Sequence, residues 1–114
     1  MAAKTLDFNE VMIRNFIESL RPEDPETRKQ LDYGYTYEKQ VFILFSIRPF
    51  YADPSQKIES DFAKIRYYKS RDEWAVYWMR ASGKWELYHP AQKFAGLADI
   101  LREIKEDENG CFFG

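Results

Sequence analysis

The sequence predicts an α+β domain in which one helix precedes a five-stranded antiparallel sheet and a second helix follows it. Its 114 residues are the usual size of a single domain, so we treat 1–114 as one unit. Apolar residues recur at helical spacing near both ends, whereas strand-like patterns fill the middle. The turns between the expected strands are short, which favours a meander in which consecutive strands pair.

The first helix is expected over residues 7–20. Asp7 is a suitable N-cap, and Glu10 completes the spacing of a capping box. An apolar stripe at helical spacing predicts the packed face, which consists of Ile13, Phe16, Ile17 and Leu20. Two prolines in residues 21–30 end this helix, and we expect a loop there, in which Asp24-Pro25 could cap one short helical turn.

Five strands are expected, over residues 31–38, 40–48, 58–69, 73–80 and 84–89. The first alternates apolar and polar residues, so it has one buried face and one exposed face. The second is apolar at both parities, which predicts a central strand covered on both sides. A loop over 49–56 and tight turns at 70–72 and Ser82-Gly83 connect the rest.

The last helix is expected from Phe94 to Asn109, with Gly110 as the left-handed residue after it. Its apolar stripe consists of Leu97, Ile100, Leu101 and Ile104. The tail over 111–114 is mostly apolar, and we expect it to fold back onto the domain.

Composition limits the functional class. Aromatic residues make up 18% of the chain, more than one small core easily buries, so some aromatic surface is expected to face a partner. The net charge of −2 gives no overall attraction to nucleic acid or to an anionic membrane. The charge is uneven, however, because residues 62–89 carry six Lys or Arg against three acids, whereas 99–108 carry five acids against two bases.

Localisation follows from the same features. No stretch approaches the roughly 18 apolar residues of a membrane span, so no membrane partner is expected. The first residues lack the charged and apolar regions of a signal peptide, and the single cysteine excludes an internal disulfide. The sequence therefore predicts a cytoplasmic protein.

The aromatic and basic residues of the later strands are the candidate site. Candidates for ligand binding or for an interface are Arg48, Lys64, Arg66, Trp74, Trp78, Arg80 and Trp85. Alternation puts Phe62, Lys64 and Arg66 on one side of their strand, and Trp74 and Trp78 together on one side of the next. Which sides align across the sheet depends on a register that the sequence leaves open.

Three interpretations of this surface follow. In the first, it is a contact surface for a protein partner or for a second copy in a homodimer, because Trp, Tyr and Arg are enriched at such contacts. In the second, rings stack on bases and cations hold phosphate, so the face binds nucleic acid or a small anionic ligand. In the third, the two helices cover opposite faces and the tryptophans are simply core.

Few catalytic arrangements are possible. One His and one Cys exclude the usual zinc sites, and no Gly-rich phosphate loop is present, so we expect no cofactor and no metal. The sharpest catalytic hypothesis pairs His89 with Cys111, whose thiolate an imidazole would activate. We favour the plainer interpretation of a strand-end His and a buried small Cys, and expect a non-enzymatic domain.

Three segments together resemble a family of small, uncharacterised bacterial proteins, catalogued as a domain of unknown function. They are LDYGYTYE with FSIRP, then AKIRYYKSRDEWAVYWMRASGKWELY, and finally GCFFG. The resemblance covers residues 31–114 and implies a compact α+β domain of bacterial origin. It implies no activity, cofactor or catalytic residue.

Overall fold

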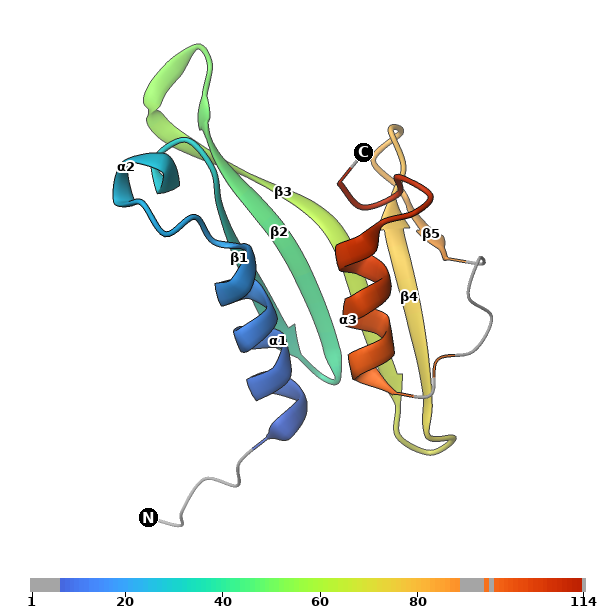
Figure 1. The fold of residues 1–114 in the computed structure, drawn as a ribbon. Helices are drawn as coiled ribbons and strands as arrows, with labels where there is room; N and C mark the ends of the chain where they lie inside the picture. The colour runs from blue at the N-terminus through green and yellow to red at the C-terminus, as the bar shows by residue number, and fades with distance from the viewer. Residues whose placement is uncertain (1–6, 89–93, 95, 114) are drawn as a thin grey trace.

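The computed structural model describes residues 7–88, 94 and 96–113, and its elements follow the predicted order (Figure 1). The helices are α1 (Phe8–Leu20), α2 (Pro25–Arg28) and α3 (Leu97–Glu106). The strands are β1 (Asp32–Glu38), β2 (Val41–Phe50), β3 (Asp53–Tyr68), β4 (Glu73–Met79) and β5 (Trp85–Leu87). Neighbouring strands pair antiparallel in the order β1-β2-β3-β4-β5, so the predicted α+β meander is confirmed.

Both long helices lie side by side on one face of the sheet (Figure 1). The core forms between them and the sheet, where Ile13 and Phe16 of α1 and Ile100 and Ile104 of α3 are buried. Phe42, Leu44, Ala63, Ile65 and Val76 complete it from the central strands. The interpretation with helices on opposite faces is therefore wrong, and β2 has no helix on its second side among the described residues.

The hairpin of β2 and β3 is longer than the sequence predicts. The predicted loop over residues 49–56 is mostly strand, and only Tyr51 and Ala52 form the turn. Pro49 and Pro54 fit because β1 ends opposite Ile47 and β4 ends well before the turn. A strand with one neighbour does not need every N–H for pairing, so it accepts proline. The hairpin consequently extends beyond the helices (Figure 1).

A β-bulge in β3 overturns part of the predicted alternation. Leu44 pairs with Ala63, but the next residue, Phe45, pairs with Asp61, so Phe62 is the extra residue. The bulge turns the Phe62 side chain to the helix-covered side, where it is buried against Phe113 at a ring distance of 5.0 Å. The prediction that Phe62 shares a face with Lys64 is therefore wrong.

Hydrogen bonds from side chains fix α1 onto β1. Asp7 caps α1 by accepting from the amides of Asn9 at 3.0 Å and Glu10 at 3.2 Å, as predicted. The Glu10 carboxylate does not reach back to the cap, however. It accepts from the Tyr35 hydroxyl at 3.1 Å, while the Tyr37 hydroxyl donates to Asp7 at 2.7 Å. Burial and this bond raise the pKa of Tyr37 to about 12.

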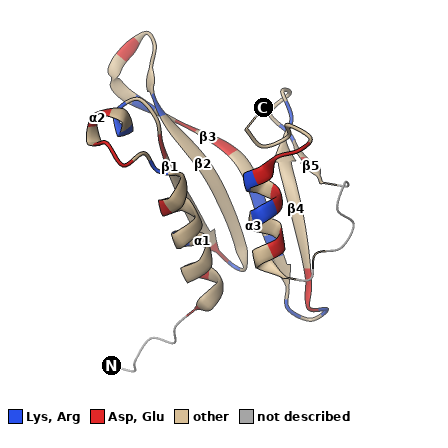
Figure 2. Ribbon diagram, in the orientation of Figure 1, with Lys and Arg blue, Asp and Glu red and all other residues tan. Residues whose placement is uncertain are grey.

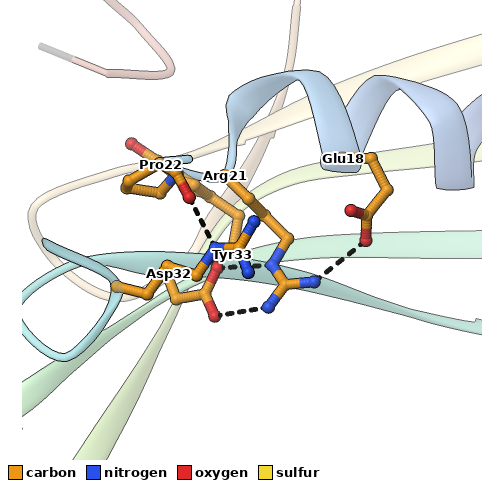
Figure 3. Close-up of polar contacts among 6 residues, drawn as sticks. Glu18, Arg21, Pro22, Asp32 and Tyr33 are labelled. Atoms are coloured by element: carbon orange, nitrogen blue, oxygen red, sulfur yellow. Dashed lines mark hydrogen bonds and ion pairs between the residues drawn. The ribbon is translucent and has the colours of Figure 1, made fainter. Parts of the chain in front are cut away.

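The other end of α1 is held by an ion pair (Figure 3). Arg21 donates from Nε to one Asp32 oxygen at 2.7 Å and from Nη2 to the other at 3.1 Å, and also contacts Glu18. The segment after it is not wholly the predicted loop, because Asp24 caps the short helix α2 by accepting from the Glu26 amide at 3.2 Å.

This ion pair should make stability depend on pH. The hydrogen bond from Arg21 lowers the pKa of Asp32, so the carboxylate stabilises the fold above its unfolded pKa of about 4, and the contribution disappears as pH falls through the lower folded value. We expect Asp32→Asn to cost about 1–2 kcal/mol at neutral pH and less in acid, as measured by urea unfolding at both pH values.

Glu18→Gln is the matched control, because Glu18 contacts the same guanidinium from a side chain that is 55% exposed. It should change stability by less than about 0.5 kcal/mol. An equal loss in both variants, or a loss in Asp32→Asn that persists in acid, would contradict the prediction.

Asp107 directs the C-terminal tail. It follows α3 in the left-handed conformation, with φ 46°, which the sequence predicts for Gly110; Gly110 is left-handed too, three residues later. The Asp107 carboxylate accepts from the amides of Phe112 at 3.0 Å and Phe113 at 2.8 Å. Phe112 is buried against Tyr88, so the predicted folding back of the tail is confirmed.

Replacing Asp107 with alanine should destabilise the domain by about 1–3 kcal/mol, because two amides lose their acceptor and alanine is strained at positive φ. Asp107→Asn keeps one acceptor oxygen and tolerates this conformation, so it should cost less than about 1 kcal/mol. Thermal unfolding of the two variants measures the difference. Equal losses would mean that the negative charge, rather than the acceptor geometry, holds the tail.

Candidate interaction surface

The register decides which residues share the face that no described helix covers, which we call the open face. Lys64 pairs with Ile43 on one side and with Tyr77 on the other, and Arg66 pairs with Val41 and Ala75. Directly paired residues point to the same side of a sheet. By this register the open face carries Asp32, Gly34, Thr36 and Glu38 of β1, and Val41, Ile43, Phe45, Ile47 and Pro49 of β2. From β3, β4 and β5 it carries Lys57, Glu59, Asp61, Lys64, Arg66, Tyr68, Glu73, Ala75, Tyr77, Met79, Trp85 and Leu87.

The register separates the three predicted tryptophans. Trp78 pairs with Ala63 and Trp74 pairs with Tyr67, so both lie on the helix-covered side and pack against the core. Trp85 pairs with Met79 on the open face. One tryptophan is therefore available to this surface, and the other two are structural.

Two of the predicted arginines lie elsewhere. Arg80 follows β4 and contacts Glu86 at 3.7 Å. The two side chains are 55% and 41% exposed, so this ion pair contributes little to stability. Arg48 lies near the β2–β3 turn, next to Lys29 and Lys57. Of the seven predicted residues, the structure thus brings Lys64, Arg66 and Trp85 together on the open face.

Two cations of the open face, Lys64 and Arg66, lie over aromatic rings. Lys64 Nζ is 4.9 Å from the centre of Tyr77 and 6.0 Å from that of Trp85, and Arg66 is 4.7 Å from Tyr68. Such contacts hold a charge in place by attraction to the ring face. Both cations are therefore positioned without a carboxylate partner.

Two acids share this face and this strand. Glu59 pairs with Ile47 and Asp61 with Phe45, which places both on the open face, on the other side of the bulge from the cations. None of the four charges forms an ion pair within 4.0 Å inside the described part of the chain. Around the bulge, β3 thus presents two acids on one side and two bases on the other along one line. Lys57 lies farther along that line and donates to the Lys29 carbonyl near the hairpin turn.

Apolar side chains flank that charged line. A Cβ built on Gly34 would lie 2.7 Å from the Phe45 ring, so the ring lies across β1 at a position that only glycine leaves open. Ile43 and Phe45 were not candidates in the sequence, since only the register shows which parity of β2 is open. The alternation of β2 alone gave no signal for them.

The His89–Cys111 hypothesis receives no support from the thiol. His89 lies outside the described residues. Burial raises the pKa of Cys111, and the Asp107 and Glu86 carboxylates raise it further. An activated cysteine needs the opposite change.

The described residues contain neither a membrane-spanning helix nor a cluster of metal ligands. No helix there is long and apolar enough to cross a membrane. No group of three or more His, Cys, Asp or Glu side chains within those same residues is arranged to hold a metal ion.

Comparison with known proteins shows which family the chain belongs to. A comparison with curated proteins and another with solved structures each gave no match. A family model described as a domain of unknown function, DUF3024, matches residues 2–114, which is nearly the whole chain. The chain therefore belongs to this DUF3024 family, in agreement with the resemblance noted in its sequence.

Proposed function

We propose that this domain is a homodimerisation module in which the open faces of two copies pack together. The observation that carries the proposal is the line of charges on β3, in which Glu59 and Asp61 precede the bulge while Lys64 and Arg66 follow it. A surface that meets its own copy must be complementary to itself. An acidic segment and a basic segment on one strand meet that condition.

In the expected dimer the sheets of the two copies face each other, and the two-fold axis lies in the plane midway between them. The axis runs at right angles to β3 and passes over the bulge. Rotation about it reverses the strand, so Lys64 comes opposite Asp61 of the second copy, and Arg66 comes opposite Glu59. Each contact occurs twice because the interface is isologous. Sheets stack about 10 Å apart, a distance that these long side chains can span together.

Residues on the neighbouring strands β2 and β4 also lie symmetrically about this axis. Leu44 pairs with Ala63 beside the bulge, so Ile43 and Phe45 flank the axis on β2. Trp78 pairs with Ala63 as well, so Tyr77 and Met79 flank it on β4. Apolar residues would therefore meet apolar residues on both sides of the charged line, as in the core of an interface.

Other uses of the face receive less support. An axis parallel to β3 would bring Lys64 against Lys64 of the second copy, and like charges in such contacts are unfavourable. Nucleic acid on this face would place phosphates against Glu59 and Asp61 as well as against the cations. Homodimerisation is the arrangement that uses all four charges.

Sedimentation over a range of protein concentrations tests the proposal. The unaltered protein should form dimers, and Ile43→Glu should be monomeric because it puts a carboxylate into the apolar part of the interface. Ala98→Glu, at an exposed position on α3, is the matched control and should dimerise normally. A monomer at every concentration, or equal dimerisation of both variants, would refute the proposal.

The family resemblance implies a bacterial origin, and the sequence features predict a cytoplasmic location; both stay predictions. Fractionation of cells that express the protein checks the location. Recovery with membranes or in the medium would contradict it.

A further inference from the structure

A cavity of about 590 Å³ lies where the end of α2 meets the β2–β3 hairpin. Three cations and two aromatic rings line it, namely Lys29, Arg48, Lys57, Phe50 and Tyr51, together with Gln30 and two prolines. None of the lining residues is acidic, although the chain as a whole has a net charge of −2. This local positive charge is therefore a property of the cavity and not of the average surface.

The cations are only partly neutralised. Lys57 donates to the backbone carbonyl of Lys29 at 2.9 Å, which holds it beside α2 while leaving its charge unpaired. Lys29 contacts Glu26 at 3.0 Å in a pair that is 65% and 77% exposed, so the pair is weak. Arg48 forms no ion pair within 4.0 Å among the described residues. Two of the three charges thus remain free for a ligand.

The nearest acid of the hairpin turn is already engaged. Asp53 accepts from the Ser55 amide at 3.2 Å and from the Ser55 hydroxyl at 2.6 Å. In Figure 2 the hairpin tip carries red, and α2 carries both blue and red. Asp53 therefore closes the turn and forms no ion pair with Arg48 within 4.0 Å.

The aromatic residues add a second kind of contact. The Tyr51 ring is 92% exposed at the tip of the turn, and Phe50 supports it edge-on, with ring centres 5.3 Å apart. A ring this exposed is free to stack on a flat group of a ligand. A ring face beside a group of cations suits a ligand that has both a flat ring and an anion.

We infer that this cavity binds a nucleoside phosphate. Arg48 would take two phosphate oxygens with its planar guanidinium, and Lys29 and Lys57 would add charge from α2 and β3. The base would stack on Tyr51. The volume lies within the usual range of about 300–1,000 Å³ for small-molecule sites. The phosphate can belong to a free mononucleotide or to a single-stranded nucleic acid, and the experiment separates these sources.

The test is calorimetric titration of the full chain at low salt with four probes: inorganic phosphate, adenosine, adenosine monophosphate, and a short single-stranded thymidine oligonucleotide. Adenosine monophosphate should bind more tightly than either phosphate or adenosine alone. Arg48→Ala should weaken its binding at least about tenfold, and Arg48→Lys less, because lysine keeps the charge but loses the two-oxygen contact. Tyr51→Ala should reduce the advantage of the nucleotide over phosphate.

Lys105→Ala, which removes an exposed cation from α3, is the matched control and should bind normally. If the oligonucleotide binds more tightly than adenosine monophosphate, and Arg48→Ala weakens both to the same extent, single-stranded nucleic acid is the source of the phosphate. If the oligonucleotide binds equally or more weakly, the free nucleotide is the source. Absence of saturable binding to either nucleotide probe, or equal losses for Arg48→Ala and Lys105→Ala, would overturn the inference. Circular dichroism of each variant checks folding, and sedimentation tests dimerisation separately.

Discussion

Replacing Leu44 with alanine should lower the free energy of unfolding by about 2–5 kcal/mol. Leu44 is 0% exposed at the centre of β2, on the side that both long helices cover. The shortened side chain loses its burial and leaves a cavity that close-packed neighbours fill only in part. Urea unfolding of the variant and of the unaltered protein, at equal concentration, measures this loss.

Ile43 is the matched control, because it precedes Leu44 on the same strand and points to the open face. At protein concentrations low enough for monomers, Ile43→Ala should cost only about 1 kcal/mol. At higher concentrations the variant should lose additional stability, because the unaltered protein gains stability from dimerisation by mass action. Equal losses for both variants in dilute solution would mean that the open face is covered within one chain.

Reversing one charge on β3 should strongly weaken the homodimer. Arg66→Glu puts a carboxylate opposite Glu59 of the second copy, and the two-fold axis repeats the repulsion on the other side. Two favourable pairs thus become two unfavourable ones, so we expect dimerisation to weaken at least about a hundredfold. Sedimentation and light scattering would follow the change. Folding should be unaffected, because Arg66 is exposed and outside the core.

A second variant makes this prediction specific to the proposed axis. Glu59→Arg alone should also be monomeric, because the introduced guanidinium would then face Arg66 of the second copy. Mixing the two variants should restore a dimer, since each reversed residue meets an opposite charge on the other chain. Recovery in the mixture but in neither variant alone is expected only if Arg66 lies opposite Glu59. Dimers of either variant alone, or no recovery in the mixture, would rule out this axis.

Local patterns in the sequence were enough to determine the two long helices, the five strands and their order. Helical spacing in α1 and α3 and alternation in β1 can be recognised without knowing what the element packs against. The cap at Asp7 and the return of the apolar tail depend on residues close in sequence, and both were predictable. Short connections then made the meander the simplest topology.

How these elements share faces was decided by tertiary contacts alone. An amphipathic helix fits either side of a sheet that is apolar on both, so nothing local placed α1 and α3 on the same side. Trp74 and Trp78 joined the core and Trp85 the open face because the register between strands and the position of the helices decide which parity is covered, and alternation within one strand reveals neither.

The two candidate sites depend on the same long-range choices. One bulged residue, Phe62, aligned Asp61 with Phe45 and so put two acids on the face that also carries Lys64. The long β2–β3 hairpin brought Arg48 beside α2 and away from that face. Strand register and the packing of the helices therefore divided one predicted group of aromatic and basic residues into core, the open face and a separate basic cavity.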